Sequence, residues 1–130
     1  MLRLIPLLIV AISTAKTPLL AQHMDEKDSP CADVVVTADL AKCLGKARDA
    51  ADAQLDTLYQ SVRARLDAGE IQQLISAQRL WIQYRDANCV AERDLYGGGT
   101  ATGPAYSACL ESMTRARTKE LRVTYAVRLK

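Results

Sequence analysis

Apolar residues recur at spacings of three and four along three long stretches of the chain, and this is the period of an amphipathic helix. The first stretch begins at Thr37, a suitable N-cap, and ends at Gly69, a suitable C-cap. The second runs from about Glu70 to Asp94, and the third starts at Pro104. No repeat and no long strand-like alternation competes with this pattern. The sequence therefore predicts an all-α fold, a three-helix antiparallel bundle.

The central stretch carries polar side chains on the face that should be apolar. On a helical wheel, Gln78 and Arg85 fall among its apolar residues, around the chain's only tryptophan, Trp81. The third stretch likewise has Arg117 on its apolar face. Because a buried guanidinium needs hydrogen-bond partners, we expect a polar layer in which arginines stack on Trp81; the alternative is a recognition surface. Besides backbone carbonyls, the candidate partners are Asp86, Glu120 and Asp56.

The first 21 residues have the features of a secretory signal peptide. Arg3 supplies a positive charge, and residues 4–12 form an apolar segment that is too short to span a bilayer. Cleavage fits after Ala15 or after Ala21, and a retained membrane anchor is the alternative. We therefore expect a mature protein in the periplasm or secreted, with no membrane attachment.

The mature chain should consist of a short leader and one helical domain. Residues 22–36 are polar at first and then apolar, so we expect a flexible tail and a tethered extended segment before the helical domain, residues 37–130. Arg3 and Lys16 leave with residues 1–21, so that 17 basic residues become 15, against 15 acidic ones. This balance does not suit a polyanion binder, and nucleic acid is not an expected partner.

Charge is nevertheless segregated along the mature chain. Residues 22–70 hold 10 acidic and 6 basic groups, whereas residues 71–130 hold 5 acidic and 9 basic groups. This pattern predicts either two halves that attract each other in the folded state or a charged site for an external partner.

The chain has four cysteines, an even number that in an exported protein indicates two disulfides with three possible connectivities. A metal site is the rival interpretation. It is disfavoured because no short Cys-x-x-Cys pair occurs and the only histidine, His23, lies in the predicted tail. We therefore expect no metal and no cofactor.

The geometry of a helical hairpin selects one connectivity. If the second and third helices are antiparallel about a loop centred near residue 99, Cys89 and Cys109 lie ten residues on either side of it and at the same level. They should form a disulfide. Cys31 and Cys43 then remain, and their bond would fasten the N-terminal segment onto the first helix.

No constellation typical of catalysis is recognisable. The predicted folded region has no histidine, the cysteines should be oxidised, and no pair of carboxylates is placed in an evident cleft. Asp49, Asp52 and Asp56 recur at helical spacing and indicate a solvated helix face. We therefore expect a binding protein and not an enzyme.

The loop between the second and third helices contains Gly97, Gly98 and Gly99. It is no phosphate-binding loop, because no strand precedes it and no Gly-Lys-Ser/Thr follows it. It is either a flexible connector or an exposed loop that enters a partner's cleft. In the second case Arg93 and Tyr96, beside the glycines, are candidate contact residues.

Several of these residues together resemble a known family, that of LprI-type lysozyme inhibitors. The similarity covers nearly all of the mature chain, residues 31–121. It includes the string Trp-x-x-Tyr-Arg-Asp-x-x-Cys, a downstream Tyr-x-x-Cys and Thr-x-x-Arg-x-x-x-Leu. The residues that carry it are Cys31, Cys43, Ala51, Leu55, Tyr59, Ala77, Gln78, Trp81, Tyr84, Arg85, Asp86, Cys89, Tyr96, Gly98, Tyr106, Cys109, Thr114, Arg117 and Leu121.

The resemblance implies a small exported helical protein that inhibits lysozyme-type muramidases. Its partner would be a lysozyme-type glycoside hydrolase, whose cleft the loop carrying Arg93 and Tyr96 could block. The alternative is an envelope assembly module with no effect on lysozyme. Such a module would bind another envelope protein through the exposed face of the first helix or through Arg115, Lys119 and Arg122 on the third.

Overall fold

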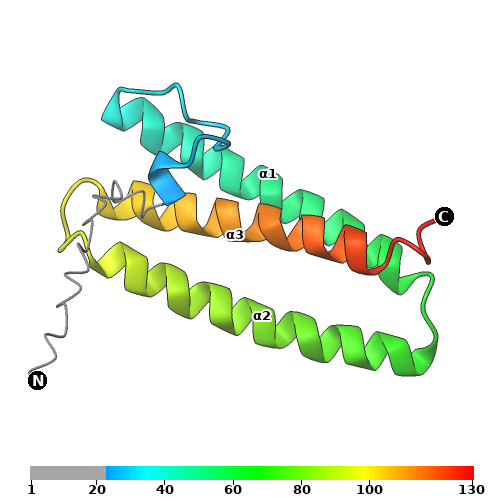
Figure 1. The fold of residues 1–130 in the computed structure, drawn as a ribbon. Helices are drawn as coiled ribbons and strands as arrows, with labels where there is room; N and C mark the ends of the chain where they lie inside the picture. The colour runs from blue at the N-terminus through cyan, green and yellow to red at the C-terminus, as the bar shows by residue number, and fades with distance from the viewer. Residues whose placement is uncertain (1–22) are drawn as a thin grey trace, which may run out of the picture.

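The computed structural model describes residues 23–130, which form one short 3-10 turn and three long helices (Figure 1). The turn is η1 (His23–Asp25), and the helices are α1 (Thr37–Arg63), α2 (Ala68–Asp94) and α3 (Thr102–Thr124). The described residues contain no strand. The predicted all-α bundle of three helices with two disulfides is therefore confirmed. The predicted signal peptide, residues 1–21, lies outside the described residues.

The turn between α1 and α2 differs from the sequence-based expectation. Asp67 is the N-cap of α2: its Oδ1 accepts a bond of 2.9 Å from the Glu70 backbone N–H, and its own N–H donates to Glu70 Oε2 at 3.1 Å. This capping box satisfies two N–H groups that would otherwise lack partners. Gly69, expected to end the first helix, therefore lies inside the first turn of α2.

The other helix starts are also displaced by one or two residues. Thr37 is the first residue of α1 and not its cap, because Val36 occupies the N-cap position. Pro104, expected to begin the third helix, follows Thr102 and Gly103 in the first turn of α3. A proline is accommodated there because the first four N–H groups of a helix have no partner within the helix.

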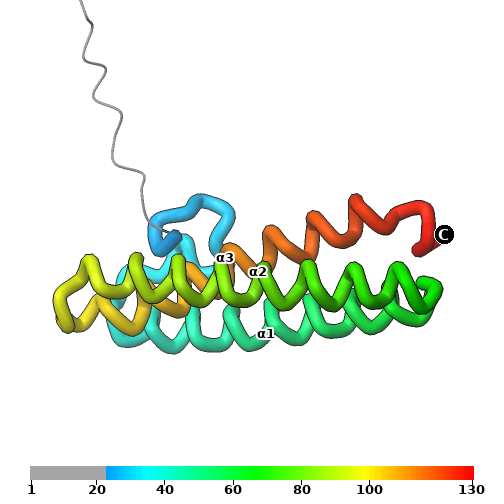
Figure 2. The backbone as a smooth tube through the Cα atoms, turned by 90° about the horizontal axis from the view of Figure 1, so that it is seen from below, coloured from blue at the N-terminus to red at the C-terminus, as the bar shows by residue number. Residues whose placement is uncertain are grey.

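Helix α3 holds the bundle together. It packs along both α1 and α2, whereas α1 and α2 make few direct contacts with each other (Figures 1 and 2). The largest core cluster lies toward the α1–α2 turn, and Trp81 packs against it. Its buried members come from all three helices and are Leu55, Leu58, Val62, Leu74 and Leu121.

The segment before α1 lies on the bundle. A second core cluster joins Cys31 of this segment to Leu44 of α1 and Ala108 of α3, and Met24 packs against it. The Cys31–Cys43 disulfide closes the same region. Where the sequence indicated a polar tail, residues 23–34 therefore form turns that fold over α3, because apolar contacts and a covalent bond hold them there (Figure 2).

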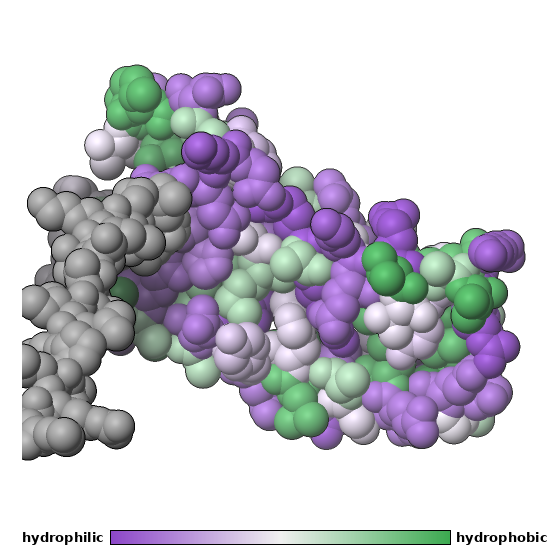
Figure 3. Space-filling view, in the orientation of Figure 1, coloured by the Kyte–Doolittle hydropathy of each residue, from purple (hydrophilic) through white to green (hydrophobic). Residues whose placement is uncertain are grey.

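The face seen in Figure 3 is mostly hydrophilic, with hydrophobic patches near the start of α1 and near the C-terminus. Val35, before α1, and Val123 and Val127, at the other end, are largely exposed. No helix of the described part of the chain combines the length and the apolar character that crossing a membrane requires.

Candidate functional site

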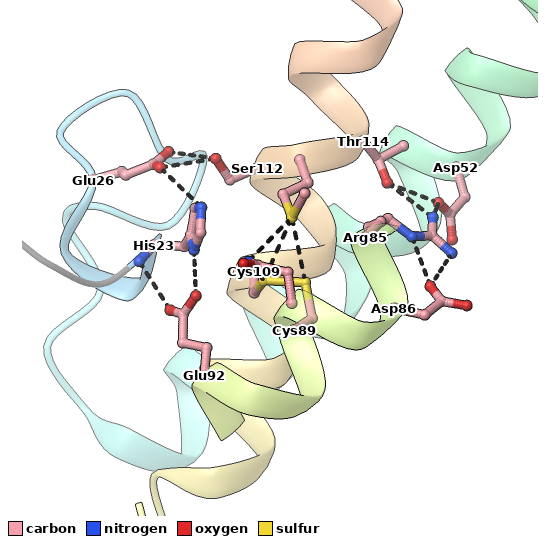
Figure 4. The surroundings of a disulfide bond; sticks show 12 residues. His23, Glu26, Asp52, Arg85, Asp86, Cys89, Glu92, Cys109, Ser112 and Thr114 are labelled. Atoms are coloured by element: carbon pink, nitrogen blue, oxygen red, sulfur yellow. Dashed lines mark hydrogen bonds and ion pairs between the residues drawn. A yellow bond between two sulfur atoms is a disulfide. The ribbon is translucent and has the colours of Figure 1, made fainter. Parts of the chain in front are cut away.

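The Cys89–Cys109 disulfide joins α2 to α3 near the loop that connects them, as the hairpin geometry predicted. Both cysteines are completely buried, and Leu110 completes their core cluster. Figure 4 shows the disulfide between two polar clusters, one around His23 and one around Arg85. The disulfide therefore fixes the base of the loop and separates two sets of charged contacts.

The loop between α2 and α3 forms one end of the bundle (Figure 1). Gly97 and Gly98 have φ angles of 58° and 81°, in the left-handed region that side chains with a Cβ disfavour. Leu95, two residues before Gly97, has a hydrophobic side chain that is 75% exposed. The loop thus presents an apolar side chain and bare backbone at the tip of a helical rod.

Tyr96 is oriented differently from the expectation for a contact residue. Its hydroxyl oxygen is buried and has no hydrogen-bond partner among residues 23–130. Burial raises the pKa of this phenol, and the carboxylates of Glu92 and Asp25 raise that pKa further. Tyr96 therefore anchors the loop toward η1 and the end of α2, and its hydroxyl is not offered to a partner.

Arg93 is already engaged within the chain. Its Nε donates to Asp94 at 2.8 Å, and its guanidinium carbon lies 5.7 Å from the centre of the Tyr106 ring. Its side chain is 37% exposed. Arg93 can thus contribute part of its charge to a partner, together with Leu95 and the three glycines.

Arg85 forms the first part of the polar layer and links all three helices. Its Nε donates to Asp86 at 2.9 Å, and its Nη1 donates to Asp52 of α1 at 3.2 Å and to the Thr114 hydroxyl of α3 at 3.1 Å. Its guanidinium lies 5.2 Å from the centre of the Trp81 ring. Two carboxylates, a hydroxyl and an aromatic ring thus stabilise the positive charge of Arg85.

Arg117 forms the second part of the polar layer, and its guanidinium carbon lies 5.8 Å from the centre of the same Trp81 ring. Its Nε donates to Gln78 Oε1 at 3.1 Å and its Nη1 to Glu120 at 2.8 Å. The structure thus brings the expected polar-layer residues together, with one difference in partner. Asp56 accepts only from Gln60 on its own helix, and Asp52, one turn earlier, takes the position beside Arg85.

A second polar cluster was not foreseen from the sequence. Arg115 of α3 forms ion pairs with Glu26 at 3.0 Å, with Asp28 at 2.6 Å and with buried Glu111 at 2.9 Å. Ser112 donates to Glu26 at 2.8 Å. The segregation of charge between the two halves was the signal that could have indicated this contact. Arg115, expected on a basic outer face, is therefore occupied within the chain.

Another unforeseen contact is that between His23 and Glu92, whose Oε2 lies 2.5 Å from the His23 Nδ1. Together with Cys109 they form the one group in the described residues whose atoms could surround a metal ion. The Cys109 sulfur is bonded to Cys89 and is not a thiolate, so this group lacks the ligand that would hold a soft metal.

An open groove between α1 and α2, here called the α1–α2 groove, was also missed. It has a volume of about 520 Å³ and contains no residue of α3, so it opens on the face that α3 does not cover. A helical wheel cannot show which apolar side of a helix remains uncovered. The groove is lined by Asp52, Leu55, Asp56, Tyr59, Ile75, Gln78, Arg79, Trp81, Ile82, Gln83 and Arg85.

Residues 29–121 match the family described as lysozyme inhibitor LprI. The chain belongs to this family. It is also 33% identical over 113 residues to an uncharacterized protein of Rhizobium meliloti (strain 1021), an alignment that covers 77% of this chain and 81% of the relative. No solved structure is significantly similar. Membership of an inhibitor family and two disulfides are the features of an extracytoplasmic protein.

Proposed function

We propose that this protein is a periplasmic or secreted inhibitor of a lysozyme-type muramidase that acts by inserting its α2–α3 loop into the enzyme cleft. The family supports the inhibitor role in general. The loop itself supports the contact: it lies at an end of the bundle, exposes Leu95 and the glycines, and has a disulfide at its base. The observation that carries the proposal is this fixed protrusion in a member of an inhibitor family.

The chemistry of the proposed target fits such a protrusion. Enzymes that cleave glycosidic bonds commonly use two carboxyl groups on opposite walls of a cleft. Leu95 would fill a sugar-binding position by apolar contact, and Arg93 would approach the acidic groups. Because the disulfide and the Tyr96 anchor order the loop before binding, little conformational entropy would be lost on association.

The experiment compares two matched variants in a muramidase assay on a cell-wall suspension. Leu95→Asp places a charge on the loop tip, and Val123→Asp places the same charge on a side chain that is 70% exposed at the other end of the bundle. We expect Leu95→Asp, alone or combined with Arg93→Glu, to abolish inhibition and Val123→Asp to leave it unchanged. Equal inhibition by the wild type and these variants, with unchanged helicity, would refute the loop assignment.

The second candidate is the envelope interaction module. It is favoured by the outer face of α2, where Leu80 and Tyr84 are 66% and 62% exposed. The basic face of α3 is a weaker candidate surface, since Arg115 is held by three carboxylates. The test is co-purification from an envelope extract. A defined envelope protein that co-purifies with the wild type and with Leu95→Asp, but not with Tyr84→Glu, would favour this function.

A further inference from the structure

The α1–α2 groove is an apolar surface that α3 and the other described segments leave uncovered. Leu55 and Tyr59 line it from α1, and Ile75, Trp81 and Ile82 line it from α2. Ile82 is 40% exposed although the adjacent Trp81 packs against the core. Within residues 23–130, few contacts join α1 directly to α2. Two long helices therefore present adjacent apolar edges over which no other part of residues 23–130 packs.

The two rims of the groove carry charges of opposite sign. Asp56 projects from α1 and Arg79 from α2, and both are exposed. In the described residues neither of them takes part in an ion pair, although Arg85 and Asp52, which also line the groove, pair with each other. Asp52 contacts Arg85, and α1 and α2 run antiparallel, so Asp56, four residues later in α1, lies at the height of Trp81, four residues earlier in α2. Asp56 is therefore within one helical turn of Arg79 along the bundle.

We propose that a second copy of this chain covers the α1–α2 groove and forms a dimer with a two-fold axis parallel to the helices. Rotation about this axis places α1 of one subunit over α2 of the other and preserves the level of every residue. Asp56 then faces Arg79 of the partner subunit, and the same contact is repeated on the other side of the axis. The interface is a bundle of four helices in which each neighbouring pair is antiparallel.

The observations favour a second copy over other occupants. An axis perpendicular to the helices would oppose α1 to α1 and so bring acidic rims together, whereas the parallel axis matches both unpaired charges at once. A sugar would need the Trp81 ring for stacking, but the guanidinium groups of Arg85 and Arg117 already lie over it.

The two helices also extend beyond the groove. Each has 27 residues and is about 40 Å long, so a contact along the full length of both would cover roughly 800 Å² per partner, which is the area in a typical stable interface. The parallel axis places both α2–α3 loops at the same end of the dimer. The proposal goes beyond muramidase inhibition and does not depend on it, because association is measured without any enzyme.

The test is a charge exchange followed by analytical ultracentrifugation of the oxidised mature protein. We expect the wild type to dimerise, and Asp56→Arg or Arg79→Asp alone to weaken the dimer about 100-fold, or about tenfold for each of the two symmetry-related pairs. The double variant should dimerise again, and an equimolar mixture of the two single variants should form a heterodimer.

The control is Asp49→Arg, which changes an exposed charge of α1 that pairs with Arg48 outside the groove. It should dimerise as the wild type does. A wild type that stays monomeric at all concentrations would overturn the proposal and leave the groove to a helix of another protein. So would a dimer that both single variants preserve, or a mixture of single variants that does not associate. Circular dichroism verifies that every variant is folded.

Discussion

Arg117 of α3 donates a hydrogen bond to Gln78 of α2 across 3.1 Å, and both side chains are buried. This contact joins two helices at a position where each would otherwise bury an apolar residue. A buried guanidinium is tolerated only while its partners remain in place. The pair thus makes the packing of α2 on α3 depend on polar geometry.

We expect Gln78→Leu to lower the free energy of unfolding by roughly 1–3 kcal/mol, because Arg117 loses a partner while it stays buried. Gln78→Leu combined with Arg117→Leu should recover much of this loss, since both polar groups are then absent. Chemical denaturation of the two single variants and the double variant provides the measurement. Strictly additive losses would show that the two side chains are not coupled.

The Cys89–Cys109 disulfide closes a segment with a sequence separation of 20 residues. Replacing both cysteines by alanine should lower the free energy of unfolding by about 3 kcal/mol, because the unfolded chain gains conformational freedom. Denaturant titration of this variant against the oxidised wild type measures the difference. An unchanged midpoint of unfolding would contradict the structural role assigned to this bond.

Tyr96 should make the fold sensitive to alkali. Its pKa in the folded protein is raised by burial and by the nearby carboxylates, so above the ordinary tyrosine pKa of about 10 the unfolded chain binds fewer protons than the folded one. Stability should therefore fall as pH rises through this range, and less steeply in Tyr96→Phe. Denaturation at several alkaline pH values measures both slopes, and identical slopes would contradict the buried position of the hydroxyl.

Asp28 should respond in the opposite pH range. A hydrogen bond from Arg115, together with its charge, lowers the pKa of this carboxyl in the folded protein. The ion pair therefore contributes to docking of residues 23–34 above the ordinary aspartate pKa of about 3.9, and the contribution disappears as pH falls through the lowered folded value. Salt should weaken it, because the pair is exposed.

A nuclear magnetic resonance titration of the Asp28 carboxyl tests this linkage. Arg115→Met should return its pKa toward the ordinary value, and Lys119→Met should change it much less because Lys119 contributes least to the shift. An Asp28 carboxyl that titrates identically in all three proteins would contradict the contact between the N-terminal segment and α3.

The fold could be predicted from the sequence because it depends on local signals. Helical spacing located the three helices, and counting from the loop placed Cys89 level with Cys109. The sequence indicated Asp56 as a partner from α1, whereas Asp52, one helical turn earlier, accepts the bond from Arg85, because that choice depends on how α1 packs against the other helices.

The remaining features arise from contacts between distant residues. Ser112 and Glu26 are separated by 86 positions, and nothing in either local sequence indicates their hydrogen bond. Tyr96 likewise lies near enough to Asp25, 71 positions earlier in the chain, for the charge of that carboxylate to raise the pKa of its hydroxyl. Ile82 is adjacent to Trp81, and its 40% exposure follows from the open α1–α2 groove, which the spacing of apolar residues does not reveal.

Titration of the oxidised mature protein into a muramidase acting on a cell-wall suspension tests the proposed function most directly. We predict that the initial rate of lysis falls in proportion to the protein added, and that the variant lacking Cys89 and Cys109 inhibits less because its loop is no longer held at the base. Unchanged rates with several classes of lysozyme, at concentrations where the protein is fully helical, would contradict the inhibitor function.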